Sequence, residues 1–202
     1  MKIFCALRPI AIAVLSGSFV AGCIMGSAPK PPKSWMVSAT RKSAAEVSVT
    51  KASRLGSLSV VAPYDRPALA VKRADGSIAF DAYNVFATAP AALLRAPLTV
   101  LLEDDGRFGR IIPSTSAARA NATVEAVVTD ISLDCRKEGV RTAHVSITLA
   151  VMENREVKMF LDGEGSADAA SGDYSAAFST AFGEAVADAL RSYPVEQGAQ
   201  QQ

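Results

Sequence analysis

Few side chains of this sequence have the chemistry of catalysis or metal binding, and their spacing does not support either. The single histidine, His144, falls on the polar face of an expected strand without a partner at ligand spacing, which favours a solvated imidazole. Asp104 and Asp105 are adjacent, but Gly106 follows them, as at a polar helix end in water. Gly163-Glu164-Gly165 lacks the rest of a phosphate-binding loop. We therefore expect no catalytic residues, no metal site and no enzyme activity.

The cysteines exclude a disulfide framework. Cys5 lies in the N-terminal segment, Cys23 follows that segment, and Cys135 is the one cysteine in the part expected to fold. Cys135 shares an expected strand with Leu133 and has no base beside it in sequence, so we predict a buried free thiol rather than a nucleophile. A link between two copies through Cys135 stays open.

The N-terminal residues have the composition of an export signal. Lys2 and Arg8 precede an apolar run at residues 10–15, too short for a bilayer span of about 20 residues. Small residues and a cysteine follow in the order Val20-Ala21-Gly22-Cys23, which resembles a lipobox. The resemblance implies cleavage before Cys23, diacylglycerol on its thiol and an N-acyl chain on its new amino group. The alternative is an ordinary signal peptide that contains a cysteine.

The chain therefore divides into four expected segments. These are a cleaved signal peptide at 1–22, a lipidated cysteine with a proline-rich and polar linker at 23–54, one folded domain at 55–194 and a disordered tail at 195–202. The formal charge of +1 falls to −1 without Lys2 and Arg8, and the remaining basic residues are spread among acidic ones. This charge pattern argues against a nucleic-acid partner, and no cofactor beyond the covalent acyl chains is expected.

Apolar alternation predicts a series of strands in the domain. They are expected near residues 55–62, 69–71, 78–80, 107–113, 124–135, 140–151 and 157–161. Asp75-Gly76 predicts a tight hairpin between the second and third of them. In the fifth, the apolar set changes parity at Thr129-Asp130, which predicts a β-bulge.

Two segments have the apolar spacing of helices. The first lies between residues 88 and 105 with Pro90 in its first turn, and Pro97 predicts either a kink or a later helix start. The second begins near Ser171 or Asp173 and ends before Pro194, with an alanine-rich side that suits close approach to a sheet. We predict a single α+β domain with a largely antiparallel sheet and about two main helices on one face.

A longer pattern resembles a known family. The segment Tyr64-Asp65-Arg66-Pro67 is followed by the hairpin, by Tyr83-x-x-Phe86-x-x-x-Pro90, by a helix and by Phe108-Gly109-Arg110-Ile111-Ile112. With the lipobox, this order resembles the ABC-type transport auxiliary lipoproteins, the PqiC-like partners of MCE-type lipid transporters in Gram-negative envelopes. The resemblance covers residues from about 35 to 193. It implies a non-enzymatic domain that faces the periplasm from the outer membrane, beside ABC transporter components and MCE-domain proteins.

The residue after the lipidated cysteine bears on localisation. Ile24 stands there, and the absence of aspartate resembles the outer-membrane sorting class, with inner-membrane retention as the alternative.

Six residues are candidates for docking a partner: Tyr64, Asp65, Arg66, Pro67, Tyr83 and Phe86. Tyrosine and arginine are favoured interface anchors. The structural alternative is a shaped turn in which Asp65 and Arg66 bond local backbone groups, and both interpretations can hold together.

Two other function classes remain open. One is a carrier that holds a phospholipid tail between helix and sheet. The other is an envelope assembly lipoprotein of the secretin-pilot or lipopolysaccharide assembly type.

Overall fold

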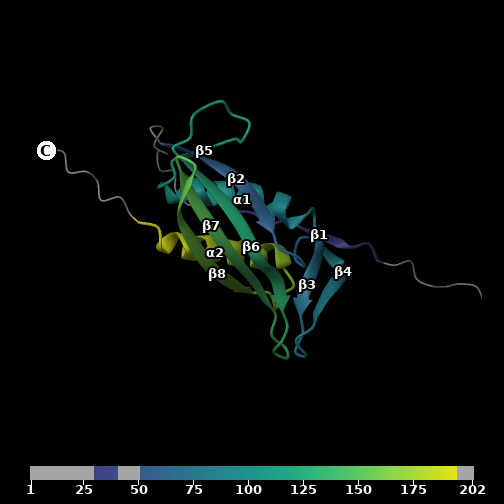
Figure 1. Cartoon of the computed structure of the whole chain (residues 1–202). Coiled ribbons are helices and arrows are strands. Elements are labelled where there is room, and N and C mark those ends of the chain that lie inside the picture. The colour runs from purple at the N-terminus through teal and green to yellow at the C-terminus, as the bar shows by residue number, and fades with distance from the viewer. Residues whose placement is uncertain (1–29, 41–50, 195–202) are drawn as a thin grey trace, which may run out of the picture. The chain divides into compact units, whose positions relative to one another are not determined.

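The computed structural model describes residues 30–40 and 51–194. The signal peptide, Cys23, most of the expected linker and the expected tail lie outside the described residues. A compact unit begins at Pro32 and has the α+β architecture predicted from sequence, with two helices and one sheet (Figure 1).

The elements follow one another in a simple order. They are β1 (Lys33–Trp35), β2 (Ala52–Val60), β3 (Ala68–Lys72), β4 (Ile78–Phe86), α1 (Pro90–Asp105), β5 (Arg110–Ile112), β6 (Ala122–Asp134), β7 (Thr142–Glu153), β8 (Glu156–Asp168) and α2 (Tyr174–Arg191).

The long strand β6 organises the sheet. One of its edges pairs with β7 along almost its whole length, and β7 pairs in turn with β8, so the predicted antiparallel meander is confirmed. The other edge of β6 is shared between two parallel partners, β2 on its N-terminal half and β3 on its C-terminal half. Next to these lie β5, parallel to β2, and β4, antiparallel to β3, with β1 parallel to β4 (Figure 1).

The sheet is therefore mixed rather than largely antiparallel. Four of the seven strand pairings between described residues are parallel. Alternation along a strand shows which side chains share a face, but it does not show the direction of the neighbouring strand. The parallel partners are also distant in sequence, so no turn signal marks them.

Local turn chemistry agrees with the sequence predictions. β3 and β4 form the expected hairpin, in which Lys72 lies opposite Ile78 and Gly76 has a φ of +81°. The register of β6 against β7 shifts between Val128 and Asp130, which confirms the bulge. This bulge keeps Val128 and Ile131 on the same buried face although they are an odd number of residues apart.

Both helices cover one face of the sheet and close the core (Figure 1). α1 packs against β2 and β5, and α2 packs against β7 and β8. α1 runs without interruption from Pro90 through Pro97, so the alternative of a later start is wrong. Pro97 is itself buried on the core side, so its packing offsets part of the lost backbone hydrogen bond.

α2 lies very close to β8. The Asp173 side chain caps the helix by accepting a hydrogen bond from the Ala176 amide at 3.1 Å. A Cβ added at Gly163 or Gly165 would lie 2.1 Å from the carbonyl oxygen of Ala185 or Ala181. The glycines and the buried alanines thus let helix and strand touch through their backbones. The predicted close approach is confirmed, and it leaves no slot for a lipid tail at this contact.

Part of the segment expected as a linker belongs to the fold. β1 extends the sheet beside β4, and the Trp35 ring meets the Tyr174 ring edge-on with 5.5 Å between centroids. Val37 is buried, and the Ser175 hydroxyl of α2 donates to the Met36 carbonyl oxygen at 2.6 Å. The chain before residue 55 therefore contributes to the core.

Candidate docking surface

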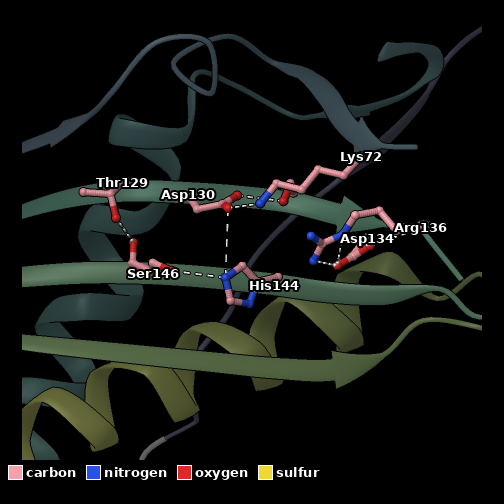
Figure 2. A network of polar contacts seen from close by, with 8 residues as sticks. Lys72, Thr129, Asp130, Asp134, Arg136, His144 and Ser146 are labelled. Carbon is pink, nitrogen blue, oxygen red and sulfur yellow. Dashed lines mark hydrogen bonds and ion pairs between the residues drawn. The ribbon is translucent and has the colours of Figure 1, made fainter. Parts of the chain in front are cut away.

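The sheet has one face that neither helix covers, and the expected docking residues lead to it. In the second half of β6, Ile131 and Leu133 point into the core, whereas Asp130, Ser132 and Asp134 alternate with them and point outward. We call the outward surface of β3, β6, β7 and β8 the helix-free face. Figure 2 shows a polar network on it that joins three neighbouring strands.

Asp130 stands at the centre of this network. Its carboxylate forms an ion pair with the Lys72 ammonium group of β3 and accepts a hydrogen bond of 2.6 Å from the Ser132 hydroxyl. The side chains of Lys72 and Asp130 are only 22% and 14% exposed. A carboxylate so shielded from water requires a positive partner, so the pair fixes β3 against β6.

Sequence reasoning missed Lys72, Asp130 and Ser132 as members of a site. The sequence contains only a weak indication of this site. Asp130 is an acidic residue at the point where the apolar alternation of the strand shifts by one residue, and Ser132 lies between two core residues. The partner on β3 could not be found, because the parallel register of β3 and β6 was unknown.

His144 belongs to the edge of this network rather than to open solvent. Its Nε2 lies 3.1 Å from the Ser146 hydroxyl and 4.0 Å from the Asp130 carboxylate, and its side chain is 28% exposed (Figure 2). Both neighbours approach the same ring nitrogen. A serine triad requires the acid on the opposite nitrogen of the imidazole, so this arrangement does not have the geometry of a nucleophile with its base.

Asp134 and Arg136 form a second pair at the end of β6. The Arg136 Nε lies 3.0 Å from both carboxylate oxygens of Asp134. These hydrogen bonds lower the pKa of Asp134 to about 2. The Arg136 side chain is 61% exposed, so the pair lies in water and at the rim of the network.

The predicted turn at Tyr64 to Pro67 adjoins the network. The Lys72 ammonium lies 5.9 Å from the centre of the half-buried Tyr64 ring, and the Arg66 guanidinium lies 4.6 Å above the Phe80 ring. Asp65, Arg66 and Pro67 are exposed.

Main-chain bonds hold this turn. The Tyr64 amide donates to the Val61 carbonyl at 2.9 Å, and the Phe86 amide donates to the Pro67 carbonyl at 2.7 Å. The shaped turn is thus confirmed, although in the described part of the chain the side chains of Asp65 and Arg66 do not close it.

Tyr83 and Phe86 have different environments. The Asp81 carboxylate accepts hydrogen bonds from the amides of Tyr83 and Asn84 and from the Asn84 side chain, which holds an irregular step in β4. Burial opposes ionisation of Asp81, but these hydrogen bonds outweigh it and lower its pKa. Beyond the step, Tyr83 is 58% exposed, whereas Phe86 is 3% exposed and packs edge-on against Phe178. Phe86 is therefore a core residue, which corrects its assignment to docking.

The acidic pair at the end of α1 has a structural role. Arg107 forks onto the Asp105 carboxylate at 2.6 and 2.7 Å and also donates to the carbonyl oxygen of Leu190 at 2.7 Å. It thereby joins the C-terminal ends of both helices. Gly106, with a φ of +80°, ends α1, so the predicted helix end is confirmed. The Asp105 side chain is only 17% exposed and pairs with Arg107, which corrects its expected position in water.

Cys135 is a half-buried free thiol, and burial raises its pKa. Among residues 30–40 and 51–194, no three His, Cys, Asp or Glu side chains gather as a metal site would require. Within the same ranges, no helix has the length and apolar character needed to cross a bilayer.

A polar cavity of about 820 Å³ lies where the two helices end, between the starts of β2 and β6. Charged and amide side chains dominate its lining, including Lys51, Asp105, Arg107, Arg119, Asn121 and Glu153. Such a lining does not match an acyl chain, which favours apolar walls.

Comparison with known proteins gives similarity at the level of the fold. No protein-family model matches the sequence, and no curated protein matches it. The crystal structure of protein XCC0632 from Xanthomonas campestris, described as family DUF330, is similar with a TM-score of 0.55 and 14% identity over 78% of this chain and 87% of that one. A second structure, described as an uncharacterized protein, has a TM-score of 0.50 and 9% identity over 69% of this chain and 81% of that one. The chain therefore shares its α+β fold with these proteins.

Proposed function

We propose that this protein is a non-enzymatic auxiliary lipoprotein of an ABC/MCE-type lipid transport system. In this proposal, acyl chains on Cys23 hold it at the periplasmic side of the outer membrane, and its folded domain docks onto the substrate-binding parts of the transporter. The observation that carries the proposal is the Tyr64 to Pro67 turn, because the residues that resemble the auxiliary family are largely exposed beside the helix-free face. The fold shared with XCC0632 is compatible with it.

The chemistry of this surface suits a protein partner. The Arg66 guanidinium lies over the Phe80 ring, and Tyr83 is exposed on the same strand as Phe80. Arginine and aromatic side chains contribute strongly to interfaces because they bury large areas and still form polar contacts. Below them, the ion pair of Lys72 and Asp130 fixes the strands, so little order has to be gained on binding.

Lipid anchoring supports a docking role. Each buried methylene of an acyl chain contributes about 0.8 kcal/mol, and two or more chains give stable membrane attachment. An anchored domain searches for its transporter in two dimensions, so a modest interface is sufficient for function.

The structure leaves no space at the binding site that the lipid-carrier alternative requires. A tail between helix and sheet would need space beside the alanine-rich side of α2, where the backbone of β8 is in direct contact. The structure provides no observation that favours an assembly lipoprotein of another system.

Co-purification from envelope extracts tests the proposal. The tagged, lipidated full chain should recover an MCE-domain protein and ABC components. Arg66→Glu should reduce that recovery at least about tenfold, because it replaces a positive charge with a negative one at an anchor position. Arg155→Glu is the matched control, because Arg155 is an exposed arginine in the turn between β7 and β8. Recovery of neither component with the anchor intact would contradict the proposal.

A further inference from the structure

Tyr83 lies on a bulge in β4 that a single carboxylate closes. Two consecutive residues of β3 pair with Asp81 and Val85, so residues 82–84 bulge out of the ladder. The Asp81 carboxylate accepts hydrogen bonds from the amide of Tyr83 at 2.7 Å and from the amide of Asn84 at 3.1 Å. Bulges redirect side chains, and this one leaves Tyr83 58% exposed.

The Asn84 side chain joins this bulge to β1. Its NH2 group donates to the Asp81 carboxylate at 2.7 Å, and its carbonyl oxygen accepts from the indole Nε1 of Trp35 at 3.3 Å. An ionised carboxylate can only accept and an indole N–H can only donate, so one orientation of the Asn84 amide satisfies both contacts. The side chain therefore connects β1 to the carboxylate that closes the bulge.

β1 is in turn fixed to the first turns of α2. The Trp35 ring packs edge-on against the Tyr174 ring, and Val37 is buried. The amide of Ser38 donates to the hydroxyl of Ser179 at 2.9 Å. The helix thus sets the position of the indole donor that Asn84 uses.

β1 is also close in sequence to the expected lipid anchor. It begins ten positions after Cys23, a span of at most about 35 Å when the chain is fully extended. Between described residues, β1 has only three ladder pairs with β4. The hydrogen bond between Trp35 and Asn84 is therefore a substantial part of what joins the two strands.

We infer that Trp35 and Asn84 are positioning residues for docking through Tyr83. Their hydrogen bond holds the Asp81 bulge in the form that presents the tyrosine, so the strand nearest the anchor controls the docking surface. The docking role rests on the proposed function, whereas the hold on the bulge is a property of the protein alone.

Amide exchange in the protein alone tests the hold on the bulge. Trp35→Phe keeps a ring against Tyr174 but removes the indole donor, and exchange of the Tyr83 and Asn84 amides should become about three- to tenfold faster. Met36→Ala is the matched control, because Met36 is 54% exposed and contacts α2 through its carbonyl oxygen. Unchanged rates in Trp35→Phe, or an equal rise in Met36→Ala, would overturn the inference.

Global destabilisation is separated by the core amide of Val145 on β7, whose exchange should not change in Trp35→Phe. A double variant tests whether both residues act on the bulge together. Asn84→Ala should speed exchange at Tyr83, and adding Trp35→Phe should bring no further increase. An equal rise at Val145, or additive increases at Tyr83, would contradict the positioning role.

Photo-cross-linking in envelopes tests the consequence for docking. With benzoyl-phenylalanine at position 83 of the lipidated chain, Trp35→Phe should lower the yield of MCE-domain adducts at least about threefold. The yield from position 66 should not change, because main-chain bonds hold that turn.

The two arms distinguish the inference from the proposed function. Adducts from position 83 that Trp35→Phe leaves unchanged, or equal losses at both positions, would overturn the positioning role. Absence of adducts from both positions in the parent chain would contradict the proposed function and, with it, the docking role of Trp35. Amide exchange would still decide whether β1 holds the bulge.

Discussion

Asp130 and Asp134 lie on the same strand face but depend on neighbours in different ways. Asp130 is held among Lys72, Ser132 and His144, whereas Asp134 relies on the exposed Arg136. Because the Asp130 carboxylate is shielded from water, it needs the positive charge of Lys72 to remain stable when ionised. For Asp134, water screens the pair, so its electrostatic effect is clearer in titration than in stability.

The low pKa of Asp134 gives a prediction with a defined sign. The pKa is about 2 in the folded state and near 3.9 in an unfolded chain, so the pair stabilises the fold above pH about 4 and loses this effect as the pH falls towards 2. Arg136→Gln should raise the pKa of Asp134 towards 3.8, as followed by carboxyl-detected NMR titration.

Because Arg136 is exposed, the same change should cost less than about 1 kcal/mol of unfolding free energy. Arg155→Gln, the distant control, should leave the titration of Asp134 unchanged. An unaltered pKa in Arg136→Gln would show that another group holds this carboxylate ionised.

Cys135 should react slowly while the protein is folded. Burial raises its pKa, so the thiolate fraction at pH 8 is lower than in an unfolded chain. Alkylation by iodoacetamide, followed by peptide mass mapping to separate Cys135 from the other cysteines, should accelerate on unfolding in urea. Equal rates in both states would mean that the thiol is accessible and its pKa unperturbed.

Among the elements, the contact of α2 with β8 depends most directly on particular residue types. Gly163 and Gly165 leave no room for a side chain against the backbone of α2, whereas the buried alanines on the helix fit the strand. The sequence contained the alanine half of this contact in an interpretable form. The glycine half could only be set aside as lacking the rest of a phosphate-binding loop, because the role of two glycines on alternate positions depends on the element that faces them.

Gly163→Ala and Gly165→Ala should therefore each destabilise the protein by about 1–3 kcal/mol, since the added methyl group forces α2 away from the sheet. Urea unfolding measures the change. Gly183→Ala is a matched control in α2, where a new Cβ meets no heavy atom within 4 Å. That variant should be neutral or more stable by up to about 1 kcal/mol, because alanine favours helix. Similar losses at all three positions would contradict the close-contact account.

Secondary structure and the antiparallel pairing of consecutive strands were largely predictable, whereas the parallel pairings were not. Alternation identified the long strands, Asp75-Gly76 identified a hairpin, and the parity change at Thr129-Asp130 identified the bulge. The three-residue strand β1 is too short for periodicity to show. The parallel partners of β6 lie more than 60 positions away in sequence, where local sequence carries no information on register.

Over the whole molecule, the helices cover one face of the sheet and leave the other to a polar network with aromatic and arginine residues beside it (Figure 1, Figure 2). The sequence pattern placed Tyr64, Arg66 and Tyr83 at least partly on the surface, as observed. It could not separate Tyr83 from Phe86, because the irregular step at Asp81 decides which of them faces the core. It also could not join Lys72 to Asp130, which requires the parallel register.

Photo-cross-linking in native envelopes tests the central claim, that this surface docks onto a transporter component. Benzoyl-phenylalanine at position 66 or 83 of the lipidated chain should form adducts with an MCE-domain protein. The same group at position 187, where exposed Ala187 lies on α2, is the control and should not form them. Adducts with an MCE-domain protein from positions 66 and 83 alone are the predicted result. Absence of these adducts, or equal yield from position 187, would contradict docking through the turn and the helix-free face.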